Sequence, residues 1–199
     1  MTSRNGVFDR TVVSALVVGG LIITLALIGD PASEIFQWTR GDIYDGELWR
    51  LVTAHLVHLD MRHALINVGV LILLTGLFGH VFTPTRHAIH AFVGMLIIDL
   101  GLTWLSNLEW YVGLSGVLHT LAAAAVVRLI VDHQDRIAWG VAIFGLFKIA
   151  FENTAGGLPF SGDQSRVVTD AHLFGVLAGM ILGLIPIGTQ RARRSTTRV

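Results

Sequence analysis

The stretch ALINVGVLILLTGLFGHVFTP, residues 64–84, decides the fold class of this chain because it contains no Asp, Glu, Lys or Arg. A helix needs about 20 mostly apolar residues to cross the hydrocarbon core of a bilayer, and this stretch is long enough. Backbone in lipid must satisfy its own hydrogen bonds, which favours a helix, and the run lacks the alternation of a β-barrel strand. We therefore expect a transmembrane helix here.

Five further apolar runs extend this interpretation to the whole chain: residues 11–29, 87–108, 110–127, 137–151 and 171–187. Asp99 and Lys148 are the only acidic or basic residues within them, histidine aside. The sequence predicts an all-α, polytopic membrane protein, a six-transmembrane-helix bundle in one domain over residues 1–199. A signal peptide is the weaker alternative for the first run, which is longer than a typical signal and precedes no small-residue cleavage site.

The composition also indicates a membrane protein. Of 199 residues, 53% are hydrophobic and only 14% are charged. A soluble domain carries roughly a quarter of its residues as charges, so a soluble enzyme is disfavoured, as is a disordered chain. The formal net charge is zero, which argues against a nucleic-acid partner. The absence of cysteine excludes disulfides, thiolate metal ligands and a cysteine nucleophile.

The distribution of arginines predicts the orientation. Six spans put both termini on one side, where nine arginines fall against four on the other, so the termini, 1–10 and 188–199, are expected in the cytoplasm. The opposite side carries most acidic residues and two long segments. We expect segment 30–62, with Trp38, Tyr44 and Trp49, to form an interfacial aromatic belt, and the glycine-rich segment 152–170 to be a mobile lid.

Polar residues inside a membrane are costly unless they are paired or face water, so they mark candidate sites. Ser115 lies in GLSG at the start of the fourth run, and His172 begins the sixth run at a similar depth. Histidine is the usual general base for a serine nucleophile. Gly175 and Gly179 form a small-residue face that lets the sixth helix pack tightly. The structural alternatives are a small-residue helix contact for GLSG and a helix-capping role for His172.

A second group contains His63 and Asn67, four residues apart and therefore on one helix face. Both can donate hydrogen bonds to a developing oxyanion, and an interhelical polar contact is the alternative. His55, His58 and His63 with Asp60 also raise the possibility of zinc. Their spacing matches no common helical zinc motif, so we expect no metal.

Asp99 and Lys148 form a third group. Both are expected in the non-cytoplasmic half of the bilayer, where a pair between them would reduce the cost of burial. A structural pair is favoured over proton or ion transport, because a transporter usually shows repeated halves with broken helices.

In combination, these motifs resemble the rhomboid family of intramembrane serine proteases, from about Trp49 to Gly179. The carrying motifs are WR at 49–50, HALIN at 63–67, GLSG at 113–116, and AHLFG at 171–175. The stretches WRLVTAHLVHLDMRHALIN and GLSGVLHT are similar to the rhombosortase subgroup in particular.

The resemblance implies roles for the matching residues. Ser115 corresponds to the nucleophile and His172 to the base, a dyad without a third carboxylate, while His63, Asn67 and the backbone N–H of Ser115 correspond to the oxyanion donors. His119 stands where many rhomboids carry a tyrosine that packs on the catalytic histidine, and His119 as a competing base is a weaker alternative. The supporting residues are Gly113, Gly116, His119, Gly175, Gly179, Trp49, Arg50 and His58.

The resemblance also implies a rhomboid-like bundle, without a cofactor, in the bacterial inner membrane, with its active site open to the periplasm. Its partners would be the lipid bilayer and transmembrane protein substrates, in particular secreted or surface proteins with a C-terminal Gly-Gly anchor. The alternatives are a general rhomboid protease with other single-span substrates, an inactive rhomboid-like protein that binds clients, and a small transporter.

Overall fold

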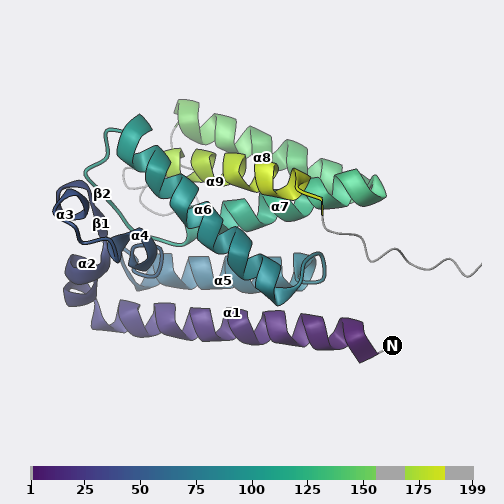
Figure 1. Ribbon diagram of the computed structural model, residues 1–199, viewed down its shortest axis with the longest axis horizontal. Helices are drawn as coiled ribbons and strands as arrows, with labels where there is room; N and C mark the ends of the chain where they lie inside the picture. The colour runs from purple at the N-terminus through teal and green to yellow at the C-terminus, as the bar shows by residue number, and fades with distance from the viewer. Residues whose placement is uncertain (1, 156–168, 187–199) are drawn as a thin grey trace, which may run out of the picture.

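The computed structural model describes residues 2–155 and 169–186. These residues form a largely helical chain with two short strands (Figure 1). In chain order the elements are α1 (Thr2–Ile28), α2 (Asp30–Phe36), β1 (Trp38–Thr39), α3 (Arg40–Tyr44), α4 (Arg50–Thr53), α5 (Met61–Phe78), α6 (Pro84–Leu105), β2 (Trp110–Tyr111), α7 (Ser115–His133), α8 (Arg136–Ala155) and α9 (Thr169–Leu184).

Each of the six predicted apolar runs corresponds to one of the long helices α1 and α5 to α9. Among the described residues, four helices are long and apolar enough to cross a membrane: α5, α6, α7 and the Arg10–Ile28 part of α1. Helix α9 is apolar but shorter, at 16 residues. The largely helical prediction is confirmed, whereas six crossings stay a prediction for α8 and α9.

Several helix ends differ from the predicted boundaries. Helix α5 ends at Phe78 and Pro84 already begins α6, so the helix predicted over residues 64–84 is shorter at its end. The fourth run does not begin a helix at residue 110, because Trp110 and Tyr111 form strand β2 and α7 begins only at Ser115. The fifth helix continues past residue 151 to Ala155, so Glu152 lies in a helix rather than in the predicted lid. Of that lid, residues 156–168 lie outside the part of the chain that the structure describes.

The long helices pack so that several of their ends meet at one end of the bundle. Helix α1 packs against α5, and α7 packs against α6, α8 and, most extensively, α9. The short elements α2 to α4 and the β1–β2 pair gather at the end of the bundle opposite the N-terminus, where α5 and α9 begin and α8 ends (Figure 1). Residues from the beginnings of α5, α7 and α9 and from the last turns of α8 are therefore brought near one another.

Glycines on α9 allow its close approach to α7. A Cβ atom added at Gly175 would collide with the carbonyl oxygen of Gly116, and one at Gly179 would lie 2.7 Å from Cβ of Ala123. Gly183 continues the same face one turn further, because its Cβ would lie 2.7 Å from the carbonyl oxygen of Ala124. Small residues at this spacing let two backbones approach closely in a membrane. The contact fixes the depth of α9 relative to α7.

Segment 30–62 is folded onto the bundle, and the aromatic-belt prediction is wrong for Trp38. This residue is fully buried, because β1 pairs with β2 in antiparallel register and sets Trp38 opposite Tyr111. Tyr44 and Trp49 are exposed, as an interfacial position requires. Trp49 donates a hydrogen bond from Nε1 to the carbonyl of Ile35, at 3.3 Å.

Arg50, the second residue of the WR motif, is buried within segment 30–62. Its guanidinium lies 3.1 Å from Asp42 and 2.6 Å from Glu47, and it donates to the carbonyls of Glu34 and Gln37. Five donors in a fixed planar fork can satisfy this many partners at once. Arg50 therefore joins α2, α3 and the start of α4 into one unit.

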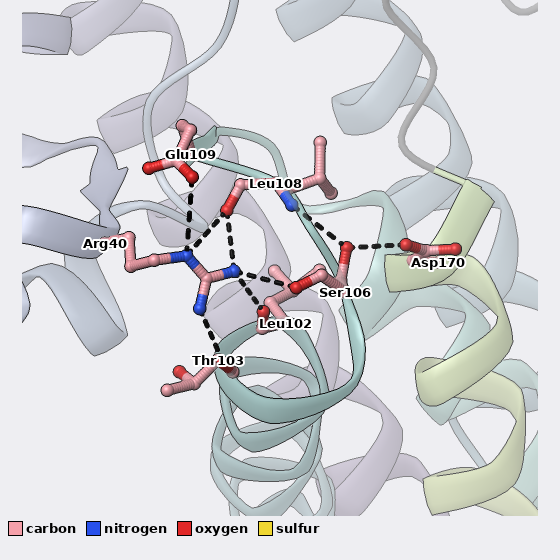
Figure 2. A network of polar contacts seen from close by, with 7 residues as sticks. All are labelled: Arg40, Leu102, Thr103, Ser106, Leu108, Glu109 and Asp170. Carbon is pink, nitrogen blue, oxygen red and sulfur yellow. Dashed lines mark hydrogen bonds and ion pairs between the residues drawn. The ribbon is translucent and has the colours of Figure 1, made fainter.

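Arg40 attaches this unit to the end of α6 (Figure 2). Helix ends leave carbonyl groups without intrahelical partners, and a cation there is favourable. The Ser106 hydroxyl continues the network, because it donates to Asp170 Oδ2 of α9 at 2.6 Å. A chain of contacts thus runs from segment 30–62 to the first turn of α9, two residues before His172. The carbonyl groups that accept hydrogen bonds from the Arg40 guanidinium are those of Leu102, Thr103, Ser106 and Leu108.

Candidate active site

Ser115 and His172 meet at the beginnings of α7 and α9. Ser115 is the first residue of α7, and His172 lies in the first turn of α9. The Oγ atom of Ser115 is 2.9 Å from Nε2 of His172, within hydrogen-bond distance. His172 is buried, with 7% of its surface exposed. The glycine contacts between α7 and α9 hold the two residues at the same depth, and the pair has the geometry of a nucleophile beside its base.

A carboxylate lies on the other side of His172, contrary to the expected dyad without one. Oε2 of Glu152 is 3.0 Å from Nδ1 of His172, and the Glu152 side chain is fully buried. An ionised carboxylate only accepts hydrogen bonds, so Nδ1 carries the proton of a neutral His172. Nε2 then presents its lone pair to the Ser115 hydroxyl, which is the tautomer that a general base for serine needs.

Lys148 completes this network from one turn earlier on α8. Its Nζ atom donates to Oε1 of Glu152 at 2.7 Å and to Nε2 of His119 at 3.1 Å. The pair predicted between Asp99 and Lys148 is therefore wrong. Asp99 instead lies with its Oδ1 atom 3.4 Å from Nε2 of His55, and both are buried.

His119 packs on His172 and does not point a free nitrogen at Ser115. The two imidazole rings stack with centroids 4.4 Å apart and planes 22° apart. Because an ammonium only donates, Nε2 of His119 accepts from Lys148, and the Nδ1–H donates to the backbone carbonyl of Ser115 at 2.7 Å. Both ring nitrogens are thus occupied. This arrangement favours the packing role over that of a competing base.

The turn before α7 requires a glycine. Gly113 has φ +119°, a conformation that side chains rarely adopt, and an added Cβ would lie 2.9 Å from Cε1 of His63. Its N–H donates to the carbonyl of Ala54 at 2.9 Å, and its carbonyl accepts from the Tyr111 hydroxyl at 2.6 Å. Burial raises the pKa of Tyr111, so the hydroxyl remains a donor. These contacts present Ser115 at the start of the helix.

The two predicted oxyanion residues lie on α5, next to this turn. The His63 ring lies against Gly113. The backbone N–H of His63 donates a hydrogen bond to Oδ1 of Asp60 at 2.7 Å, and Asp60 thereby caps the beginning of α5. The side-chain amide of Asn67 donates to the backbone carbonyl of His63 at 3.0 Å. The structure therefore brings His63 beside the serine turn, while Asn67 is engaged within its own helix.

His58 supports the same region from the loop before α5. Its ring meets the His63 ring edge-on, with centroids 4.9 Å apart, and Nε2 lies 3.5 Å from the backbone N–H of Leu114. Nδ1 lies 3.3 Å from the carbonyl of Leu56. Burial lowers the pKa of His58 to about 3, so the ring is neutral at physiological pH. A neutral ring can accept from Leu114 and donate to Leu56 at the same time.

The side chains considered for zinc face different partners. His55 faces Asp99, His58 faces His63 and the backbone, and Asp60 caps α5. Within residues 2–155 and 169–186, no group of three or more metal-binding side chains converges.

Sequence reasoning missed Glu152 and its pairing with Lys148. The available signal was their i, i+4 spacing, which puts a basic and an acidic side chain on one face of α8. The fifth apolar run is predicted to end at Phe151. Lys148 therefore falls inside the predicted helix and Glu152 outside it.

Comparison with known proteins identifies the family of the chain. The profile of the Rhomboid domain matches residues 45–188, which include every candidate site residue. A search of curated proteins found no match. Together with the apolar helices, the profile match shows that the chain is an integral membrane protein and belongs to the rhomboid family, whose members are generally intramembrane serine proteases.

Proposed function

We propose that this protein is a rhombosortase-like intramembrane serine protease with Ser115 as its nucleophile and His172 as its general base. The observation that carries the proposal is the 2.9 Å contact between Ser115 Oγ and His172 Nε2. The buried Glu152 carboxylate on Nδ1 supports it, because this contact leaves Nε2 free to accept a proton.

The reaction begins when His172 Nε2 takes the Ser115 proton and Oγ attacks a peptide carbonyl carbon. The carbonyl oxygen becomes an oxyanion, for which the donors are the Ser115 N–H at the start of α7, the His63 ring and the Asn67 amide. Asn67 serves this role by turning its amide away from the His63 carbonyl. His172 then protonates the leaving amine, and an ester links Ser115 to the acyl fragment.

The second half of the reaction releases that fragment. His172 Nε2 accepts a proton from water as the water oxygen attacks the ester carbonyl, and the proton then returns to Ser115 Oγ. Neither half needs a cofactor.

We further propose that the substrates are transmembrane proteins with a Gly-Gly motif before a C-terminal anchor. The support is the likeness of WRLVTAHLVHLDMRHALIN and GLSGVLHT to rhombosortases. We place both termini in the cytoplasm from the arginine distribution, and the site, which lies at the opposite end of the bundle, at the periplasmic face.

The test combines labelling and cleavage. The full chain in detergent is treated with a fluorophosphonate probe, and cells expressing it receive a Gly-Gly-tailed reporter or a generic rhomboid substrate. We expect Ser115→Ala to lose labelling and cleavage while still inserting, and Ser14→Ala on the exposed face of α1 to behave as wild type. Wild-type chain that neither labels nor cleaves would favour a client-binding protein, and cleavage of the generic substrate alone would favour a general rhomboid protease.

A further inference from the structure

We propose that Glu152 is a positioning residue that makes His172 a competent base, and that Lys148 holds Glu152 in place. The inference rests on the proposed function of Ser115 and His172. It extends the expected pair to a triad of Ser115, His172 and Glu152. Each of the two hydrogen bonds in this triad has one defined donor and one defined acceptor.

The first support is that both oxygens of Glu152 are occupied. The side chain is fully buried, Oε2 faces His172 Nδ1 at 3.0 Å, and Oε1 accepts from Lys148 at 2.7 Å. A buried carboxylate is strongly unfavourable unless it is paired and hydrogen-bonded, and here both conditions are met. The two oxygens therefore have separate roles. Oε1 pairs with the Lys148 ammonium, which stabilises the buried charge, and Oε2 accepts the hydrogen bond from the His172 imidazole.

The second support is the tautomer of His172. A neutral imidazole carries its proton on one nitrogen, and the partner of the other nitrogen decides which one. With Glu152 on Nδ1, the lone pair of Nε2 points at Ser115 Oγ. When Nε2 takes the serine proton, the carboxylate stabilises the imidazolium that forms, as in soluble serine proteases.

The third support is that Lys148 links three helices. From α8 it contacts Glu152 on the same helix and His119 on α7, and His119 in turn stacks on His172 of α9. Lys148 therefore fixes the rotation of α8 relative to the Ser115–His172 pair. Without Glu152, its ammonium would place an uncompensated positive charge beside the imidazolium.

This geometry predicts an unusual outcome for Glu152→Gln. Because Lys148 only donates, it retains the amide oxygen of the new side chain, and the amide NH₂ is turned toward His172 Nδ1. That NH₂ selects the tautomer with its proton on Nε2, which cannot accept the serine proton. Removal of Lys148 frees the amide to rotate, and its oxygen can then face the Nδ1–H again.

The experiment measures rates of fluorophosphonate labelling and reporter cleavage for the purified full chain. We expect Glu152→Gln to lower kcat at least about 100-fold, in line with the loss when the orienting carboxylate of a serine protease becomes an amide, with little change in KM. We expect Glu152→Asp to retain more activity than Glu152→Gln. The decisive variant is Lys148→Met combined with Glu152→Gln, which should be at least tenfold faster than Glu152→Gln alone. Glu34→Gln, on an exposed carboxylate, is the matched control and should act as wild type.

A direct measurement covers the case in which a variant does not fold. Nitrogen-15 NMR of histidine-labelled wild type should show His172 with its proton on Nδ1. The opposite tautomer, or a wild-type rate for folded Glu152→Gln, would overturn this inference and leave the proposed function intact. A wild-type chain that is neither labelled nor able to cleave the reporter would instead overturn the proposed function.

Discussion

The imidazole of His119 lies flat against that of His172, with ring centroids 4.4 Å apart, while its Nδ1–H holds the backbone carbonyl of Ser115. His119 therefore touches both members of the Ser115–His172 pair without taking part in the proton transfer. Stacking limits the rotation of His172 about its Cβ–Cγ bond, and the hydrogen bond ties that restraint to the helix that carries the serine.

A first prediction follows from this contact. His119→Ala removes the stacked ring and should slow fluorophosphonate labelling roughly two- to tenfold, because an aromatic pair contributes about 0.5–1.5 kcal/mol. His119→Phe should retain more activity than His119→Ala, since it preserves the stacked face. His172→Ala should abolish labelling. Labelling that disappears with His119→Ala and persists with His172→Ala would instead make His119 the base.

A second prediction concerns the interface between α7 and α9. Gly175→Ala places a Cβ atom on the carbonyl oxygen of Gly116, so α9 must move away and carry His172 from Ser115. Overpacking of this kind destabilises by about 1–3 kcal/mol, which thermal unfolding in detergent would detect. The rate of fluorophosphonate labelling should fall as well, because His172 moves away from Ser115.

Helix α8 offers the matched control for that substitution. A Cβ atom at Gly145 would meet nothing within 4 Å, so Gly145→Ala should leave labelling unchanged. It should be neutral or stabilise by about 0.4–1 kcal/mol, because alanine reduces the freedom of the unfolded chain. Equal losses for Gly175→Ala and Gly145→Ala would show that the close approach of α9 to α7 is unimportant.

The sequence could predict the long helices and the positions of Ser115 and His172 near the beginnings of two of them. Apolar runs of this length identify helices, and both residues begin such runs on the same side. Hydropathy gives depth along a helix but not the direction in which a side chain points. For this reason Asp99 and Lys148 looked like partners, although Asp99 faces His55 and Lys148 faces Glu152.

Glu152 and Trp38 show two further limits. Glu152 is charged, so a hydropathy criterion excludes it from the span, and only the rotation of α8 against α7 and α9 reveals its burial beside His172. Trp38 resembled an interfacial residue because aromatic residues often lie there. Its burial depends on pairing with β2, more than 70 residues later in the chain, which no local pattern encodes.

A third prediction concerns Arg40 at the end of α6. Arg40→Met leaves several carbonyls of that end without their donor and should lower the free energy of unfolding by about 1–3 kcal/mol. Arg40→Lys should recover only part of this loss, because an ammonium cannot reproduce the planar fork of five donors. Labelling should also slow, since the same network reaches Asp170 in the first turn of α9. Arg62→Met, on an exposed side chain, should change neither quantity.

A fourth prediction concerns the stability of the fold against pH. Burial lowers the pKa of His58 to about 3 from its ordinary value of 6.5. Between these values the unfolded chain binds a proton at His58 that the folded chain does not bind, so stability rises with pH across this window. Conversely, as the pH falls from about 6.5 towards 3, His58 destabilises the fold, whereas above 6.5 it has no such effect.

His58→Gln removes this titration while retaining a side chain that can accept from Leu114 and donate to Leu56. The midpoint of thermal unfolding in detergent should therefore fall less steeply for His58→Gln than for wild type as the pH is lowered from 7 to 4. A constant offset between the two proteins would reflect only the lost packing against His63, because packing does not depend on protonation of residue 58. The difference between the two slopes is the quantity that tests the prediction, and parallel slopes would contradict it.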